Sequence, residues 1–147
     1  FPGGLGIETF IEFAKGYDLD ISVMEAQKMK DTWFNAFPEM KMYMKGELGY
    51  VKTLTGRLRA DTTYCAEKNT PFQGLAADGA KIALYNLMDA GFELVGFVHD
   101  EIITEVPENT AEEMRRLQEK IMVNSMSLVV PDVKVSVEST ISPRYCK

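Results

Sequence analysis

The sequence predicts an α+β fold in which helices pack on a mainly antiparallel sheet. Apolar residues recur at helical spacing in several stretches, and two short apolar segments flank a polar turn as in a β-hairpin. Valines at residues 133–137 alternate with polar residues, as in a half-buried strand. Since a hairpin pairs its strands antiparallel, we expect helices covering a mainly antiparallel sheet.

Two helices are expected near the start of the chain. Apolar residues recur at helical spacing over residues 7–14, and Gly16 ends this first helix. Ser22 and Glu25 form the sequence pattern of a capping box, which predicts a second helix that runs up to Pro38.

The middle of the chain is expected to hold an extended segment and then a longer helix. The stretch GYVKTLTGRLR, residues 49–59, mixes β-branched residues, glycines and basic side chains, as extended segments and loops do. The turn-like Asn-Thr-Pro at residues 69–71 is expected to start a helix that ends at Gly91. Small residues in its first half, including Gly79, permit another backbone to approach closely.

A hairpin, a helix and a last strand are expected in the remainder. ELVGFV and IITEV are typical of two strands joined by a tight polar turn. Thr110 and Glu113 form a second capping-box pattern, which predicts a helix that ends before Pro131. The alternating valines of residues 133–137 complete the sheet.

Length and composition are those of a soluble globular protein with one domain or two interlocked lobes. The chain has 147 residues, of which 46% are apolar and 26% charged, close to the averages for such proteins. Its apolar runs are far shorter than the ~20 residues needed to cross a bilayer, and no signal peptide opens it. We therefore expect a cytoplasmic protein with no membrane partner. Because the chain begins with Phe1 and not Met, we also expect it to be a piece of a longer polypeptide.

Charge and metal-ligand residues exclude some classes of function. The formal net charge of −6 is unlike the basic excess of a free-standing nucleic-acid-binding protein. Cys65 and Cys146 lack CxxC spacing, which argues against a structural zinc site and a disulfide framework. Since His99 is the only histidine, a metal hydrolase with several histidine ligands is excluded.

The turn of the predicted hairpin places His99 beside two adjacent acids, Asp100 and Glu101. Asp favours turns, so an exposed polar turn without further function is one interpretation. The other is catalytic, because two-metal phosphoryl transfer needs several carboxylate oxygens and Mg²⁺ prefers such ligands. In extended backbone the two acids point to opposite sides, so one can ligate a metal directly and the other can act only through another ligand or after local reorientation. The pair could supply part of a metal-binding set.

Other residues suggest contact with nucleic acid. Arg57 and Arg59 lie among lysines and tyrosines and could bind phosphate or stack on a base, although an exposed surface loop would have the same composition. Gln73, just before the long helix, could place its amide against a base edge or belong to an ordinary helix start. On these residues alone both interpretations stay open.

Two long motifs are more specific: NTPFQGLAADGAKIALYNL at residues 69–87 and GFVHDEIITEVPE at residues 96–108. In this order and at this interval they resemble the family A (polymerase I-like) DNA polymerases, with wording closest to phage-like members. The stretch GYVKTLTGRLR is similar to the segment before the first motif, and FPGGLGIETF to the end of the family's fingers helix. The resemblance covers nearly the whole chain.

The resemblance implies a role for each residue of the acidic turn. Asp100 matches the invariant metal-binding aspartate of the palm hairpin, and Glu101 matches the acid beside it, so both are expected to be catalytic. His99 matches the histidine that approaches the primer terminus.

The resemblance also implies contacts with DNA. Gln73 would touch the minor groove of the template–primer, Arg57 and Arg59 would lie in the DNA-contacting loop, and Asn69 would lie near the primer–template. Residues 1–52 would be the remainder of a fingers subdomain. Residues 53–147 would be the C-terminal part of a palm subdomain.

The family's reaction is attack of a primer 3′-hydroxyl on the α-phosphate of a deoxynucleoside triphosphate, with two Mg²⁺ ions. Its other catalytic aspartate and its triphosphate-binding residues would precede Phe1. The chain alone is therefore expected to be inactive or nearly so, and to need an N-terminal polymerase chain or segment besides primer–template DNA and dNTP. Two alternatives remain: a non-catalytic nucleic-acid-binding or assembly fragment, such as a prophage remnant, and an unrelated Mg²⁺-dependent phosphohydrolase that uses Asp100.

Overall fold

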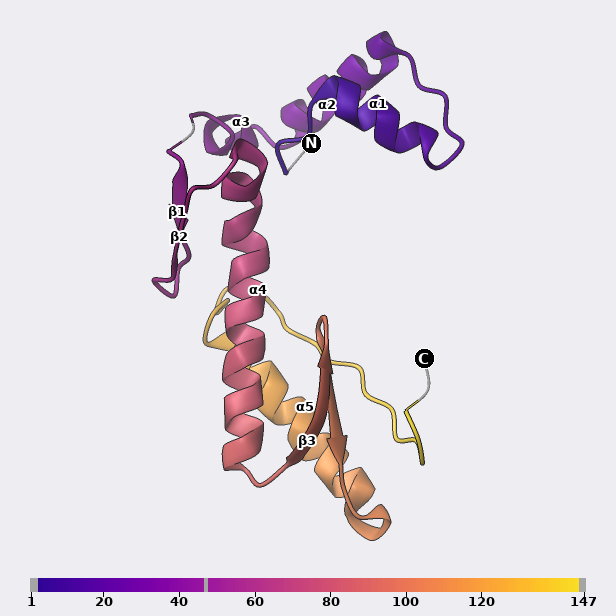
Figure 1. Ribbon diagram of the computed structural model, residues 1–147, viewed down its shortest axis with the longest axis vertical. Coiled ribbons are helices and arrows are strands. Elements are labelled where there is room, and N and C mark those ends of the chain that lie inside the picture. Colours follow the sequence, from indigo (N-terminus) through magenta and orange to yellow (C-terminus); the bar gives the residue numbers. More distant parts are fainter. Residues whose placement is uncertain (1–2, 47, 146–147) are drawn as a thin grey trace. The chain divides into compact units, whose positions relative to one another are not determined.

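The predicted α+β fold is confirmed by a computed structural model that describes residues 3–46 and 48–145 (Figure 1). The chain divides into two compact units, Phe1–Phe72 and Gln73–Lys147. The boundary between these units differs from the one predicted between fingers (residues 1–52) and palm (residues 53–147). The assignment of those two subdomains stays a prediction. Cys146 lies outside the described residues. Within them, no helix combines the length and apolar character that crossing a bilayer requires.

The first unit consists of short helices, a small antiparallel hairpin and the start of a long helix. In chain order these elements are α1 (Ile7–Lys15), α2 (Val23–Ala36), α3 (Glu39–Tyr43), β1 (Tyr50–Lys52), β2 (Leu58–Ala60) and the beginning of α4 (Tyr64–Asp89).

The helix boundaries predicted near the N-terminus are confirmed. Gly16 follows the last residue of α1. At the start of α2, the Glu25 N–H donates to Ser22 Oγ at 3.3 Å, and the Ser22 N–H donates to Glu25 Oε2 at 2.9 Å. The Ser22 hydroxyl also donates to this carboxylate, and these bonds hold the pKa of Glu25 below its usual value. The capping box predicted from the sequence is therefore present.

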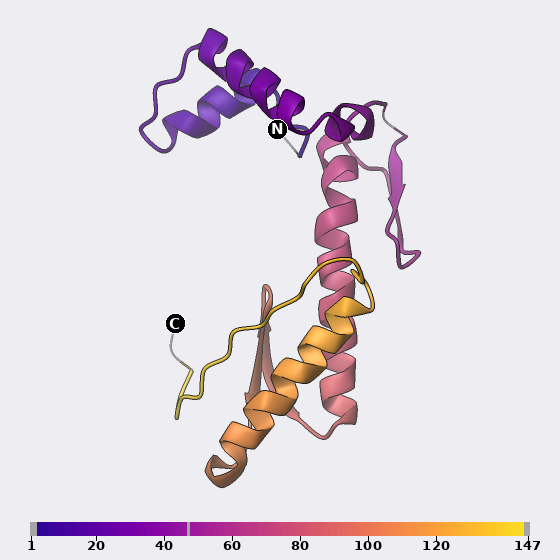
Figure 2. The same ribbon diagram turned by 180° about the vertical axis from the view of Figure 1, so that it is seen from behind.

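The second unit contains the rest of α4, a hairpin and a further helix. Its other elements are β3 (Glu93–Val98), β4 (Glu101–Glu105), the 3₁₀ turn η1 (Glu108–Thr110) and α5 (Ala111–Ser127). Figures 1 and 2 show α5 and the β3–β4 hairpin beside the C-terminal part of α4.

An apolar core holds the second unit together. Leu87 and Ala83 of α4 pack with Phe92 and with Ile102 of β4, and all four are buried. Partly buried side chains of α4, β3 and α5, together with Val106 just after β4, surround this cluster. The β3–β4 hairpin is thus fixed to α4 and α5 by burial of apolar surface, the main favourable term in folding.

Close approach of another backbone at the small residues of α4 is confirmed. A Cβ placed on Gly79 would lie 2.5 Å from the Met126 sulfur and 3.4 Å from the Met126 Cα. Glycine at this position therefore lets α4 and α5 pack closely.

The predicted start of the long helix at residues 69–71 is wrong. Helix α4 begins at Tyr64, and Pro71 lies inside it. Pro71 has no N–H for the carbonyl of Glu67, so one helical hydrogen bond is absent. The first turn is held by contacts outside the helix, because the Tyr64 hydroxyl donates to the Met44 carbonyl at 2.7 Å. These contacts favour the helix on the N-terminal side of the proline.

The capping box predicted at Thr110 and Glu113 does not form. Thr110 precedes α5, but its hydroxyl donates to the Pro107 carbonyl at 3.1 Å and makes no cap bond. The 3₁₀ turn directly before α5 brings that carbonyl within reach. The helix therefore begins at Ala111 without a side-chain cap.

The strand predicted at residues 133–137 is also wrong. Within the described residues that follow α5, 128–145, no strand forms. The described strands pair only as β1 with β2 and β3 with β4, which leaves residues 133–137 without a neighbour to hydrogen-bond. Val135 and Val137 are nevertheless partly buried. The alternation marks a half-buried segment of irregular backbone.

Candidate active site

The β3–β4 hairpin ends in a two-residue turn. Val98 pairs with Glu101, which leaves His99 and Asp100 between the strands. The predicted turn also included Glu101, which instead begins β4 because it pairs with Val98. His99 has φ +56°, in the left-handed region that non-glycine residues seldom adopt, although histidine does so more often than most. Backbone held in a rare conformation is frequent at functional sites.

Asp100 presents its carboxylate at the tip of this hairpin. Its side chain is exposed, and within residues 3–46 and 48–145 it has no hydrogen-bond or ion-pair partner. Asp100 lies in the turn and not in extended backbone, so the expected opposite orientation of two strand residues does not apply to it. Its oxygens are open to a ligand.

Glu101 is the first residue of β4 and is held differently. The Tyr145 hydroxyl donates to Glu101 Oε2 at 3.1 Å. The C-terminal segment thus reaches the acidic turn and restrains one of its two carboxylates.

Helix α5 also holds β4 by hydrogen bonds. The Gln118 amide nitrogen donates to the Ile102 carbonyl at 3.1 Å, and the Thr104 hydroxyl donates to Gln118 Oε1 at 2.7 Å. Ile102 itself belongs to the apolar core. The residues directly after the acidic turn are therefore held by both polar and apolar contacts.

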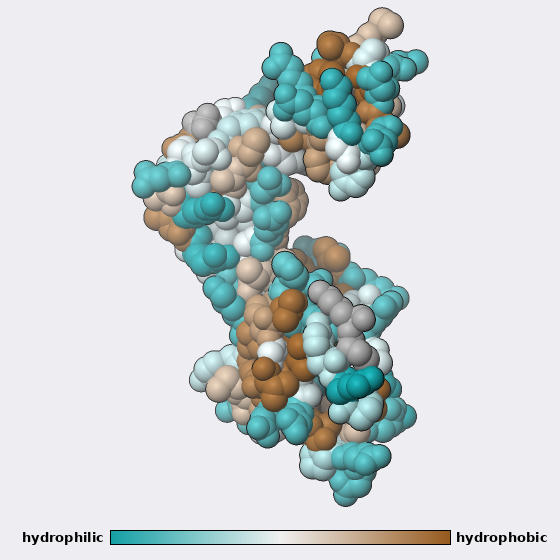
Figure 3. Space-filling view, turned by 45° about the vertical axis from the view of Figure 1, so that its right-hand side comes forward, coloured by the Kyte–Doolittle hydropathy of each residue, from teal (hydrophilic) through white to brown (hydrophobic). Residues whose placement is uncertain are grey.

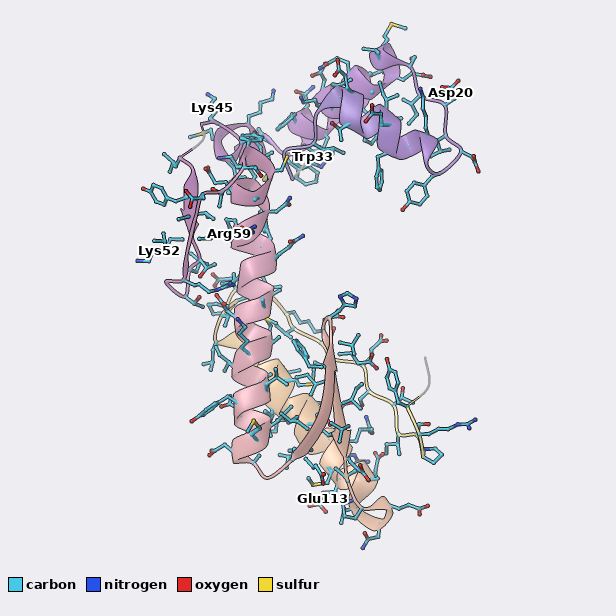
Figure 4. The ribbon with its side chains drawn as sticks, viewed as in Figure 1. Asp20, Trp33, Lys45, Lys52, Arg59 and Glu113 are labelled. Carbon is cyan, nitrogen blue, oxygen red and sulfur yellow. The ribbon has the colours of Figure 1, made fainter. Side chains whose placement is uncertain are left out.

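A second hairpin, formed by β1 and β2, carries basic side chains. Lys52, Arg57 and Arg59 lie between Tyr50 and Ala60, and this stretch contains no acid. Lys52 pairs with Leu58 and Arg59 pairs with Val51, so Lys52 and Arg59 lie on opposite faces. Figure 4 shows Lys52 pointing away from α4 and Arg59 lying between the hairpin and α4. We call residues 50–60 the basic hairpin.

The other two predicted DNA contacts lie on α4. Asn69 faces the N-terminal loop, because its amide nitrogen donates to the Gly3 carbonyl at 3.4 Å. A Cβ on Gly3 would lie 2.7 Å from Asn69 Oδ1, so glycine permits this contact. Gln73 is exposed inside α4 and does not precede it, contrary to the sequence-based expectation.

The structure thus gathers the predicted residues into separate groups. His99 and Asp100 form one turn in the second unit, and Glu101 directly follows it as the first residue of β4. Arg57 and Arg59 share the basic hairpin in the first unit, to which Asn69 also belongs.

A model of DNA polymerase family A matches residues 11–146. The chain belongs to this family. Both long motifs, residues 69–87 and 96–108, lie within the matched range. The family predicted from the sequence is therefore confirmed.

Curated family A relatives agree with this assignment. The chain is 36% identical over 159 residues to DNA polymerase I of Aquifex aeolicus (strain VF5), which covers 98% of this chain and 28% of that protein. It is 36% identical over 143 residues to the thermostable DNA polymerase I of Thermus filiformis, which covers 82% of this chain and 17% of that protein. DNA polymerase I of Streptococcus pneumoniae TIGR4 is 35% identical over 144 residues. The chain spans less than a third of the length of the first two relatives.

The acidic turn of this family A chain fits part of a magnesium site. Carboxylate oxygens of Asp100 and Glu101 are ligands of the kind that Mg²⁺ prefers. In the part of the chain that the structure describes, no group of three or more His, Cys, Asp or Glu residues could hold an ion. Among the described residues, the turn and the start of β4 thus offer two adjacent acids and no larger set of possible ligands.

Sequence reasoning missed two contributors to these hairpins. Tyr145 meets Glu101 across 44 residues of sequence, and no local pattern announces such a contact. Glu67 contacts the base of the basic hairpin through backbone N–H groups, which every residue except proline carries.

Proposed function

We propose that this chain is the C-terminal part of a template-directed DNA polymerase that transfers a nucleotide from a dNTP to a primer 3′-hydroxyl. One observation carries the proposal: in a family A chain, an exposed aspartate without a partner among the described residues stands at the tip of a firmly held hairpin. We further propose that it works in the cytoplasm of a bacterium or a phage-infected host.

In this proposal the acidic turn carries the chemistry. Asp100 and Glu101 would supply some of the ligands for two Mg²⁺ ions, with Asp100 as the direct ligand. When bound, such ions supply activation of the attacking oxygen and stabilisation of the leaving group. Tyr145 restrains the Glu101 carboxylate. His99 precedes Asp100 in the turn and would approach the primer end.

The remaining predicted residues bind DNA. Lys52, Arg57 and Arg59 concentrate positive charge on the basic hairpin of an otherwise acidic chain, which suits contact with phosphates. Gln73 is exposed and carries both a donor and an acceptor. In the minor groove, N3 and O2 acceptors occur at every correct pair, so an amide there senses pair geometry and not sequence. Asn69 supports the N-terminal loop near the primer–template.

We propose that the chain alone is inactive or nearly so. Its described residues offer two adjacent acids and no larger group of metal ligands. An N-terminal polymerase chain or segment would complete the set and would hold the triphosphate.

Primer extension tests the proposal. The chain, the polypeptide encoded directly upstream and a mixture of the two are each supplied with primed template, Mg²⁺ and four dNTPs. We expect extension in the mixture and little in either component. Asp100→Ala should abolish it, whereas Asp89→Ala, which removes an exposed acid at the end of α4, should leave it intact.

Absence of extension in a mixture whose components demonstrably associate would overturn the polymerase proposal. If such a mixture still bound primed DNA, the non-catalytic binding fragment would be the better description. Hydrolysis of phosphate esters without extension would favour the phosphohydrolase.

A further inference from the structure

A buried ion pair lies in the first turns of α4. Glu67 and Lys68 are adjacent in sequence, their side chains are 7% and 8% exposed, and Lys68 Nζ lies 2.9 Å from Glu67 Oε1. Glutamate and lysine are almost never this buried unless they are paired, and burying charge is costly. Because this pair is buried, its charges are not explained as those of an ordinary solvated helix surface.

The second oxygen of Glu67 binds the backbone at the base of the basic hairpin. Glu67 Oε2 accepts from the Leu48 N–H at 2.7 Å and from the Gly49 N–H at 3.2 Å. The Leu48 bond, followed by the Lys68 bond, holds the pKa of Glu67 below its usual value. Because Gly49 directly precedes β1, the carboxylate fixes the entrance of the hairpin.

The exit of the hairpin is tied to the same point. The Thr62 N–H donates to the Gly49 carbonyl at 2.9 Å, so the chain leaving β2 bonds to the residue that Glu67 holds. Farther along, Arg59 Nη1 donates to Thr70 Oγ1 at 3.1 Å. Thr70 is one turn of α4 beyond Glu67, so two successive turns of one helix contact the hairpin.

Lys68 is enclosed by aromatic rings. Its Nζ lies 5.4 Å from the Tyr64 ring centroid and 5.8 Å from that of Tyr43, within the range of cation–π attraction. The Tyr43 hydroxyl donates to the Lys68 carbonyl at 2.8 Å. Burial, together with the negative charge of Glu67, raises the pKa of Tyr43. The enclosure keeps the balancing charge beside Glu67.

We propose that Glu67, balanced by Lys68, is a positioning residue that orients the basic hairpin for contact with DNA phosphates, and that Thr70 does the same for Arg59. This inference rests on the proposed function, in which the basic hairpin binds primer–template. It also predicts the direction in which DNA affinity changes when the charge of Glu67 is removed. A negative charge near DNA should by itself weaken binding, so removing it would tighten binding unless the carboxylate acts through the hairpin.

DNA affinity as a function of salt tests the proposal. The mixture of this chain with its upstream polypeptide is titrated against a fluorescent primed template at several KCl concentrations. Glu67→Gln should weaken binding by about tenfold or more, the scale of one lost charge-assisted hydrogen bond. The plot of log affinity against log salt should become shallower by about 1 to 2, since up to two arginine–phosphate contacts are lost.

Matched variants separate positioning from charge and from general damage. Glu39→Gln removes the same charge from the exposed start of α3, and it should leave affinity unchanged or slightly tighter. In an Arg57→Ala/Arg59→Ala background, Glu67→Gln should have little further effect because the groups it positions are gone. The proposal would be overturned if Glu67→Gln lowered DNA affinity by the same factor in the double-arginine variant as in the unmodified chain. It would also be overturned if Glu67→Gln alone tightened DNA binding.

Thr70→Val keeps the test available if Glu67→Gln fails to fold. Thr70→Val preserves side-chain shape and the Glu67 contacts but removes the acceptor for Arg59. It should therefore weaken DNA binding less than Glu67→Gln does. In a chain that already carries Arg59→Ala, it should have no further effect. Full affinity in both Thr70→Val and a folded Glu67→Gln would overturn the positioning role alone. If Arg57→Ala and Arg59→Ala themselves leave affinity unchanged, the proposed DNA-binding function of the hairpin is wrong as well.

Discussion

The two hairpins of this chain are held in place by different chemistry. The β3–β4 hairpin buries Ile102 against Leu87 and Phe92 in an apolar core. The basic hairpin rests instead on the carboxylate of Glu67, which is paired with the buried ammonium of Lys68.

This difference has consequences for what each hairpin tolerates. Apolar burial is non-directional and depends on volume, so the acidic turn should be sensitive to cavities and insensitive to charge. Hydrogen bonds to a carboxylate are directional and depend on its ionisation, so the basic hairpin should be sensitive to charge and pH.

Apolar side chains also remain on the surface of the second unit, where Figure 3 shows brown atoms and where Val95, Phe97 and Val98 of β3 are exposed.

The largest expected effect on stability is a cavity in the apolar core. Leu87→Ala should lower the free energy of unfolding by about 2–5 kcal/mol, because Leu87 is fully buried. Met88→Ala is the matched control, since the next side chain along α4 is exposed. Urea denaturation gives both values, and equal losses in the two variants would contradict the assignment of this core.

Overpacking between α4 and α5 should come next. Gly79→Ala adds a methyl group where the Met126 sulfur already lies, so it should cost about 1–3 kcal/mol even though alanine favours helices. Combining it with Met126→Ala should restore part of the loss. The same denaturation experiment measures this coupling, and a Gly79→Ala variant of increased stability would show that the helices are not in close contact.

Acid should loosen the basic hairpin while the acidic turn stays in place. The folded-state pKa of Glu67 is lowered, so its stabilising contribution is present above the ordinary carboxyl pKa of about 4.5 and is lost as the pH falls through the lowered value. Amide protection factors at Leu48 and Gly49 should therefore decrease as the pH falls through the lowered pKa of Glu67, whereas those of β4 should not. Glu67→Gln should remove the pH dependence at Leu48 and Gly49, and equal loosening of both hairpins would break the comparison.

The smallest effect is expected from the exposed ion pairs of α5. Bonds from Arg115 and then Arg116 hold the pKa of Glu112 at about 2. The Glu112 contribution to stability is therefore complete above pH 4.5 and is lost as the pH falls toward 2. Because these side chains reach solvent, Glu112→Gln should change the urea midpoint only slightly at pH 7 and should flatten its decline in acid. A large change at pH 7 would contradict this account.

Local patterns predicted the elements whose determinants are local. The Ser22 and Glu25 capping box forms within one turn, and the β3–β4 hairpin follows from alternation on either side of a polar turn. The family followed from two long motifs, which also identified the acidic turn.

Elements that depend on distant partners could not be predicted in this way. The valines of residues 133–137 have the pattern of a strand, but no neighbouring strand pairs with them among the described residues. Pro71 suggested a helix start, whereas contacts from distant residues hold the turns before it. Adjacent glutamate and lysine on a helix usually face solvent, so the burial of Glu67 and Lys68 appears only in the folded chain.

The central claim is a division of labour, in which the acidic turn carries chemistry and the basic hairpin carries DNA binding. Single-turnover extension by the mixture, measured across DNA concentrations, yields a DNA affinity and a rate at saturating DNA for each variant. Asp100→Asn should abolish the rate while DNA affinity is retained, and Arg57→Ala/Arg59→Ala should weaken affinity while the saturating rate is nearly unchanged. A saturating rate that survives Asp100→Asn, or one that collapses in the arginine variant, would contradict the account.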